Sequence, residues 1–122
     1  MKPKSSNYES GRSGEQQAEA HLIKLGYQII DRNARMPFGE IDLVAKEGGD
    51  IVFIEVKSRR NSNFGFPEEA VGSRKRAQLM RLATSYMVRF GANPPPFRFD
   101  VLTIEQEGAT AGIRLVKNAL EI

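Results

Sequence analysis

The chain has 122 residues, of which 40% are apolar and 27% charged, and this is enough for a single compact domain with a hydrophobic core. It contains no Cys and one His, which excludes disulfides, thiolate catalysis and Cys-ligated zinc and makes a His-based triad or a His-rich metal site nearly impossible. Its net charge of +3 permits an anionic partner without requiring one, so any chemistry must come from carboxylates, amines or hydroxyls.

The N-terminal part combines a polar segment with a first helix. Residues 1–10 are rich in Ser, Lys and Asn, and we expect a disordered arm ahead of one domain over residues 11–122. Apolar residues then recur at helical spacing, which predicts a helix from Ser13, a candidate N-cap, to Leu25. The chain shows neither a secretory signal nor an apolar run near the ~20 residues of a membrane span, so we expect a cytoplasmic protein without a membrane partner.

The rest of the chain predicts strands around a second helix. The predicted elements are a strand in 27–35, a β-hairpin formed by 39–46 and 51–58, a helix over 73–90, and two final strands, or a strand and a short helix, in 97–106 and 112–120. The glycines of EGGD suit the tight turn of the hairpin, and ANPPP stops the second helix. This order is typical of an α/β fold with a mixed central β-sheet flanked by helices.

The hairpin places charged side chains where a strand normally carries core residues. If the turn is centred on the two glycines of EGGD, Asp42 lies opposite Glu55 and Glu40 opposite Lys57, while Ile41 and Leu43 share the other face. Opposed like charges destabilise a strand pair by roughly 0.2–1 kcal/mol, so the two central carboxylates need a cation.

Mg²⁺ is a suitable cation because it prefers carboxylates, waters and phosphate oxygens. The bland alternative is a solvated strand face on which Glu40 and Lys57 form a surface ion pair, worth about 0–1 kcal/mol. Against that alternative, IVFIEV is apolar at nearly every position, as expected for a central strand that is covered on both sides.

These residues resemble a known signature. Asp42, twelve intervening residues and then Glu55-Val56-Lys57 are similar to the Asp and Glu-X-Lys motif of the PD-(D/E)XK nuclease superfamily. GRSGEQQAEAHLIKLGY, NAR before GEIDLVA, VFIEVKSR and RFDV, in that order, resemble the bacterial YraN family, itself similar to archaeal Holliday-junction resolvases. The resemblance spans about residues 11–118, although Ile41 stands where the superfamily has a proline.

The resemblance implies a restriction-endonuclease-like fold and a metal-dependent endonuclease of DNA recombination or repair. The residues matching Asp42 and Glu55 bind one or two Mg²⁺ or Mn²⁺ ions in the superfamily, and the lysine matching Lys57 positions or deprotonates the attacking water. Val56 belongs to the expected metal-binding set, and Glu40 is either a third ligand or only the partner of Lys57. The implied partner is DNA, branched DNA included, and two-strand cutting by one small domain implies a homodimer.

A further carboxylate is expected from the first helix. Glu15 lies on the helix side that carries Leu22, toward the sheet, and matches a glutamate that completes the metal site in resolvase-like proteins. Glu19 is the competing candidate. A glutamate in the first helical turn can also serve only the helix dipole, at about 0.3–1 kcal/mol.

Basic residues near the same region are candidates for phosphate contacts. We expect Arg59, Arg60, Arg74, Lys75 and Arg76 to bind nucleic acid, since they flank the active strand and the start of the second helix. The stripe of Arg81 and Arg89 further along that helix is more typical of a solvated face. Asp100 is interpreted as structural, paired with Arg98. The alternatives to an active nuclease are a catalytically weak nucleic-acid-binding module and an interaction domain.

Overall fold

The computed structural model describes residues 6–59, 73–107 and 110–119 of the chain. The elements are α1 (Ser6–Lys24), β1 (Gln28–Met36), β2 (Gly39–Glu47), β3 (Asp50–Arg59), α2 (Ser73–Met87), the 3-10 helix η2 (Val88–Phe90), β4 (Phe97–Glu107) and β5 (Thr110–Val116). The strands form a sheet in the order β1-β2-β3-β4-β5, in which β3 and β4 run parallel and the other neighbours antiparallel. The mixed sheet flanked by helices that the sequence predicts is therefore confirmed.

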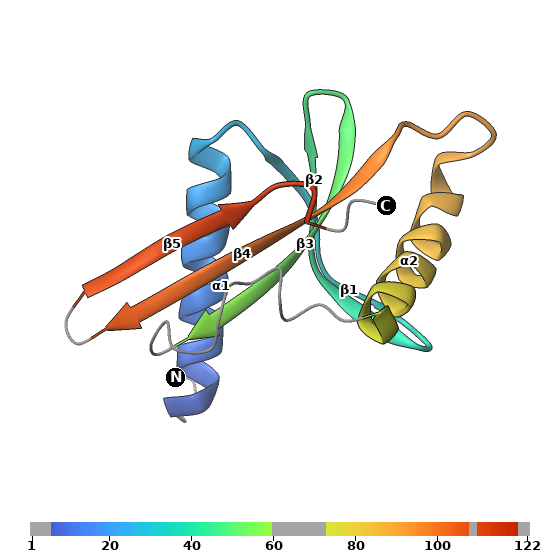
Figure 1. Ribbon diagram of the computed structural model, residues 1–122. Helices are drawn as coiled ribbons and strands as arrows, with labels where there is room; N and C mark the ends of the chain where they lie inside the picture. The colour runs from blue at the N-terminus through green and yellow to red at the C-terminus, as the bar shows by residue number, and fades with distance from the viewer. Residues whose placement is uncertain (1–5, 60–72, 108–109, 120–122) are drawn as a thin grey trace, which may run out of the picture.

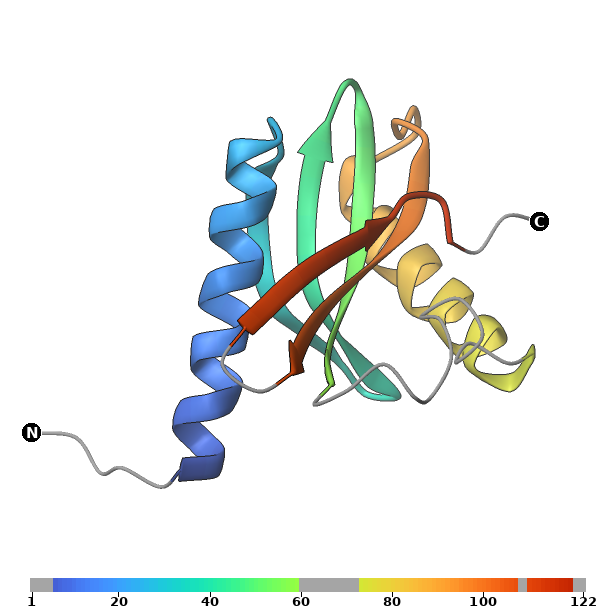
Figure 2. The same ribbon diagram turned by 60° about the vertical axis from the view of Figure 1, so that its left-hand side comes forward.

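The two helices cover opposite faces of the sheet (Figures 1 and 2). On the α2 side, Leu79, Leu82 and Tyr86 pack on Phe53 and Phe99. On the α1 side, the core contains Ala18, Leu22, Leu43, Ala45, Val52, Ile54, Leu102 and Ile104. Both faces of β3 are thus buried, which explains why its sequence is almost continuously apolar.

The first helix begins at Ser6, seven residues before the predicted start, so Ser13 is not its N-cap and residues 6–10 are helical rather than part of an arm. The prediction was wrong because hydrophobic periodicity marks only the part of a helix that packs on a core, and the first turns carry polar residues. Leu22 is fully buried, whereas Leu25 lies past the end of the helix and is half exposed. Within the described residues, no helix is long and apolar enough to cross a membrane.

The β2–β3 turn has the geometry that the sequence predicts. Gly48 and Gly49 both have positive φ values, 68° and 124°, which glycine adopts without steric cost. The paired residues run from Glu47 and Asp50 to Leu43 and Ile54 in the expected register. The hairpin prediction is confirmed over this part of the ladder.

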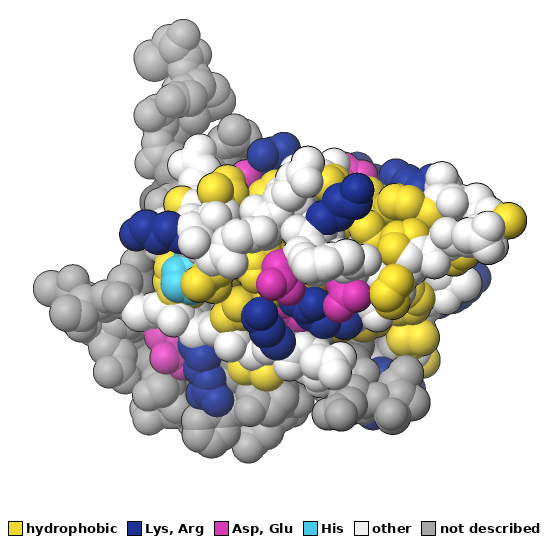
Figure 3. Space-filling view, turned by 90° about the horizontal axis from the view of Figure 1, so that it is seen from above, with side chains coloured by type: hydrophobic (Ala, Val, Ile, Leu, Met, Phe, Trp, Pro, Cys, Tyr) yellow, Lys and Arg dark blue, Asp and Glu magenta, His cyan; other side chains and the backbone are white. Residues whose placement is uncertain are grey.

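An ionic cluster lies at the end of the molecule that carries the β2–β3 turn. Arg98 donates from Nη2 to Glu47 at 2.8 Å, from Nη1 to Asp50 at 2.9 Å and from Nε to Asp100 at 3.1 Å. Asp100 is 1% exposed and also accepts from the hydroxyl of Tyr27 at 2.7 Å. Acidic and basic side chains lie together on this end (Figure 3). The cluster joins the hairpin, β4 and the α1–β1 connection, which supports the structural interpretation of Asp100.

Candidate active site

The sheet opens into a fork next to Asp42. Below Leu43 and Ile54 the β2–β3 ladder ends, and the β1–β2 hairpin leaves β3 toward α2 (Figure 1). Strand alternation breaks at the same point, because Ile41 packs on the α2 side whereas Leu43 packs on the α1 side. The expectation that Ile41 and Leu43 share a face is therefore wrong.

The cause of the break lies partly in β1. Asn33, which would oppose Asp42 in the β1–β2 register, has a left-handed φ of 51°. Asn tolerates this conformation better than most residues with a side chain. Local irregularity in both strands leaves Asp42 between the two faces of the sheet, where groups from either face can approach it.

Asp42 replaces a missing main-chain acceptor at the fork. Its Oδ2 accepts a hydrogen bond from the amide of Val56 at 2.9 Å, across the gap where a β2 carbonyl would continue the ladder. Burial raises the pKa of Asp42 to about 6, and the charges of Glu55, Glu15 and Glu40 act in the same direction, against the hydrogen bond from Val56. The carboxylate is thus held in position but is costly to ionise without a cation.

Two ammonium groups flank the second carboxylate of the fork. Glu55 Oε2 lies 3.7 Å from Nζ of Lys57 on the same strand and 3.5 Å from Nζ of Lys75 at the start of α2. The Glu55 side chain is 17% exposed, and those of Lys57 and Lys75 are 32% and 38% exposed. The structure therefore brings Lys57 next to Glu55, as the sequence motif predicts, and adds Lys75 from the start of α2.

The geometry separates the two candidate glutamates of α1. Glu15 lies close enough to Asp42 to raise the pKa of that carboxyl. Glu19 is bound to Nε of Arg32 at 2.8 Å and is not among the charges that shift Asp42. Glu15 is therefore the α1 carboxylate that is near the fork and not held by a basic partner within the described residues.

Glu40 does not form the expected pair with Lys57. It lies opposite Arg35 in the β1–β2 ladder, with 3.5 Å between Oε1 of Glu40 and Nη2 of Arg35, and its side chain is 37% exposed. Lys57 is paired with Glu55 instead. The reason is the fork, which carries Glu40 away from β3.

The oxygen atoms near Asp42 are of the type that binds a hard cation, but they do not by themselves form a complete set of ligands. Carboxylate oxygens of Asp42, Glu55 and Glu15, with the main-chain carbonyl of Val56, are the ligand types that Mg²⁺ or Mn²⁺ prefers. In the described part of the chain, no three His, Cys, Asp or Glu side chains lie near enough to hold a metal ion as they stand. A Mg²⁺ site often uses one or two carboxylates and completes its shell with waters and substrate phosphate, so these residues fit the ion in that form.

The sequence interpretation missed Thr103. It pairs with Lys57 in the parallel β3–β4 ladder and is fully buried, and its hydroxyl has no hydrogen-bond partner among the residues that the structure describes. Alternation with Leu102 and Ile104, which face α1, puts it on the face of Glu55 and Lys57. In FRFDVLTIEQ, Thr103 stands between the apolar residues Leu102 and Ile104, and this pattern could have indicated a polar side chain on the other face of the strand.

The basic residues divide into two groups. Arg74 and Arg76 are exposed on the first turn of α2, next to Lys75, whereas the side chain of Arg59 and the whole of Arg60 lie outside the described residues. Further along α2, Arg81 stacks on Phe38 at 4.1 Å, and in η2 Nη1 of Arg89 lies 3.6 Å from Asp31. These last two contacts hold α2 and η2 against the β1–β2 hairpin, so Arg81 and Arg89 have a structural role.

Replacing Glu40 with Gln is expected to change little. The side chain lies away from Lys57 and forms an exposed pair with Arg35, a type of pair worth about 0–1 kcal/mol. Glu40→Gln should therefore change the free energy of unfolding, measured in urea, by no more than about 1 kcal/mol. Any DNA cleavage should stay within about threefold of the wild-type rate, since a tenfold change corresponds to about 1.4 kcal/mol. A loss of cleavage as large as that of Glu55→Gln would make Glu40 a member of the site.

Comparison with known proteins places this arrangement in a family. The model of the uncharacterised protein family UPF0102 matches residues 14–104. Proteins of that name from Symbiobacterium thermophilum and Deinococcus radiodurans are 48% and 45% identical, over 89% and 87% of this chain and 93% and 88% of their own length. Among solved structures, a repair endonuclease from Pyrococcus abyssi is similar with a TM-score of 0.46 and 18% identity, and the matched part is 89% of this chain and 42% of that chain. The match over the segment that holds Glu15, Asp42, Glu55 and Lys57 shows that the chain belongs to the UPF0102 family.

Proposed function

We propose that this protein is a Mg²⁺- or Mn²⁺-dependent endonuclease that hydrolyses phosphodiester bonds in DNA, resolvase-like, and that it serves recombination or repair. The observation that carries the proposal is the fork, where Asp42 is half-buried among other carboxylates and Lys57 lies beside Glu55. A charge cluster of this kind, desolvated and next to an ammonium group, is more typical of a catalytic site than of a solvated strand face.

The chain's own residues have distinct roles in this proposal. Asp42, Glu55, Glu15 and the carbonyl of Val56 would hold the ion, which when bound polarises the phosphate and activates water. The hydrogen bond from the Val56 amide fixes one oxygen of Asp42 and leaves the other for the ion. Lys57 orients the attacking water, and its ammonium group balances charge on Glu55 until the ion enters.

Basic side chains beside the fork would hold the phosphates of the strand. Arg74, Lys75 and Arg76 stand at the start of α2, and Lys75 already reaches Glu55 at 3.5 Å. If Glu55 held an ion, the ammonium group of Lys75 would be available to bind a phosphate oxygen. Arg59 and Arg60 follow β3 in sequence and remain part of the proposed surface.

Cleavage assays test the proposal. Labelled single-stranded, duplex, nicked, flapped and four-way-junction DNA is incubated with the full chain and Mg²⁺ or Mn²⁺, and with EDTA in parallel. We expect metal-dependent cleavage of at least one substrate and a loss of about 10²–10⁴-fold in Glu55→Gln and in Lys57→Ala. No cleavage by the wild type, or equal cleavage by wild type and Glu55→Gln, would refute the proposal. Sedimentation of the protein alone and with a junction tests the proposed homodimer.

A catalytically weak nucleic-acid-binding module is the second candidate. The feature that favours it is Glu55, whose carboxylate is shared by two lysines in a site without three clustered carboxylates among the described residues. Salt-dependent DNA binding that is unchanged in Glu55→Gln, with no cleavage by the wild type, would select this candidate.

A further inference from the structure

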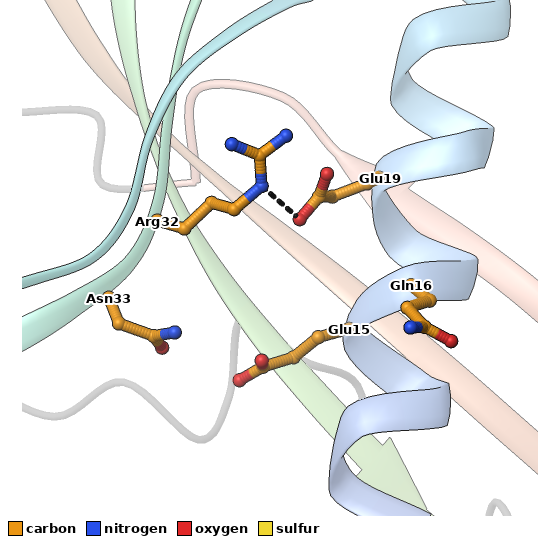
Figure 4. A pocket seen from close by; sticks show the side chains of 5 residues that line it. All are labelled: Glu15, Gln16, Glu19, Arg32 and Asn33. Carbon is orange, nitrogen blue, oxygen red and sulfur yellow. Dashed lines mark hydrogen bonds and ion pairs between the residues drawn. The ribbon is translucent and has the colours of Figure 1, made fainter.

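A polar pocket adjoins the fork on the α1 side. It has a volume of about 290 Å³ and is lined by Glu15, Gln16, Glu19, Arg32 and Asn33. Glu15 and Glu19 extend from α1 toward β1, Arg32 and Asn33 lie on β1, and Gln16 lies at the helix side (Figure 4). Asn33, which lines the pocket, lies opposite Asp42 in the β1–β2 register, between the pairs Arg32–Leu43 and Ala34–Ile41, so the pocket adjoins the proposed cleavage point.

The charges of the pocket disfavour an anionic ligand. Arg32 is neutralised by Glu19 through the 2.8 Å contact between Nε and Oε2, and Glu15 adds a negative charge. A phosphate group in this pocket would meet two carboxylates and one guanidinium already paired, so its binding is disfavoured. A nucleobase carries no charge, so the carboxylates do not repel it.

Unused hydrogen-bonding groups complete the lining. Within the described part of the chain, the side-chain amides of Asn33 and Gln16 have no hydrogen-bond partner, and Arg32 uses only its Nε toward Glu19. Two amides and the terminal nitrogens of a guanidinium are the groups that proteins use to read base edges. The volume lies near the lower end of the roughly 300–1,000 Å³ of small-molecule pockets, which is room for one base and too little for a duplex.

We propose that this pocket holds an unpaired nucleobase next to the phosphate at the fork. The inference rests on the proposed function and narrows its substrate to DNA with an unpaired nucleotide at the cleavage point, as in a single strand, a flap or an opened branch. A base inside a duplex cannot enter, because its edges are stacked and paired. The pocket thus selects structure rather than sequence.

The chain offers a matched pair of variants for the test. Asn33 and Asn118 are the residues other than glycine with positive φ in the described segments, at 51° and 55°. Glycine adopts this conformation freely, so Asn33→Gly and Asn118→Gly both remove an amide side chain and keep the backbone. Asn118 donates its main-chain amide to Asp100, a hydrogen bond that glycine retains, and it is not among the residues that line the pocket.

The experiment measures binding in EDTA, by fluorescence anisotropy, so that it does not depend on cleavage. We expect the full chain to bind a single-stranded oligonucleotide more tightly than the same sequence in a duplex, and Asn33→Gly to weaken only single-strand binding by about three- to tenfold. Asn118→Gly should bind as wild type. A set of oligonucleotides with one abasic site each should include a position whose loss is not additive with that of Asn33→Gly.

The outcomes separate this inference from the proposed function. Equal binding by Asn33→Gly and Asn118→Gly, or strict additivity at every abasic position, overturns the pocket proposal even if the protein cleaves DNA. A non-additive pair together with no metal-dependent cleavage supports the pocket and refutes the nuclease. A 2-aminopurine placed at the sensitive position should gain fluorescence on binding to wild type, as an unstacked base does, and not on binding to Asn33→Gly.

Discussion

Asp42→Asn is expected to stabilise the metal-free protein at neutral pH while it abolishes any metal-dependent cleavage. Burial and neighbouring carboxylates raise the pKa of Asp42 from 3.8 to about 6, so the folded state holds its proton more tightly than the unfolded state. The contribution of Asp42 to the free energy of unfolding therefore falls as pH rises from about 4 to about 6, and it stays lower above that window. Asn carries no proton to lose and can still accept from the Val56 amide through its side-chain oxygen.

The measurement is urea unfolding of both proteins in EDTA at pH 4, 6 and 8. The variant should equal the wild type near pH 4, where both side chains are neutral, and exceed it by about 1–3 kcal/mol at pH 8, given about 1.4 kcal/mol for each pKa unit. The pH 4 comparison is the internal control for effects of the amide itself. Mg²⁺ should stabilise the wild type and not the variant. Parallel pH profiles for the two proteins would contradict this account of Asp42.

Arg98→Leu is expected to cost about 3–5 kcal/mol, because it leaves the buried carboxylate of Asp100 without its counter-charge. The Arg98 side chain is 15% exposed and that of Asp100 is fully buried. Burial and the contact with Asp100 also raise the pKa of Tyr27 above its ordinary value, so this phenol remains a donor and cannot replace the lost cation. For a domain whose total stability is about 5–15 kcal/mol, the loss is a large share.

Thermal and urea unfolding of Arg98→Leu, Asp100→Asn and the double variant test this expectation. The double variant should be more stable than the sum of the single losses allows, since it leaves no fully buried charge without a partner. Lys117→Ala serves as the control, because Lys117 reaches Glu47 only at 3.8 Å and is 54% exposed. A cost for Arg98→Leu no larger than that of Lys117→Ala would show that the cluster does not hold this end of the fold.

The elements were predictable where their pattern comes from burial. Alternation and the glycine pair predicted the β2–β3 hairpin and its register, since residues 43–45 and 51–54 each pack in one of the two cores. The first turns of α1 were not predictable in the same way, because their sequence, SNYESGRS, carries no apolar residues at helical spacing. Sequence periodicity therefore predicts the part of a helix or strand that packs on a core, and it misses the part that extends beyond the core.

Motif spacing predicts which residues belong to the candidate site, but it does not predict their geometry. Motif spacing singled out Asp42, Glu55 and Lys57, and the structure places Lys57 beside Glu55. Register arithmetic then extended the ladder to Glu40, where the actual strands have already separated. The break depends on the left-handed backbone of Asn33 and on competition between two cores for Ile41, and neither is visible in a two-strand pattern.

The hydrogen bond from Val56 to Asp42 also turns a main-chain amide into a spectroscopic reporter. An amide proton donated to a carboxylate responds in chemical shift to the charge of that carboxylate, and this one lies 2.9 Å from the atom concerned. The Val56 resonance would therefore follow proton release and ion entry at the fork in one nitrogen–proton correlation spectrum. The Val56 amide therefore reports the charge of the Asp42 carboxylate without a probe attached to that side chain.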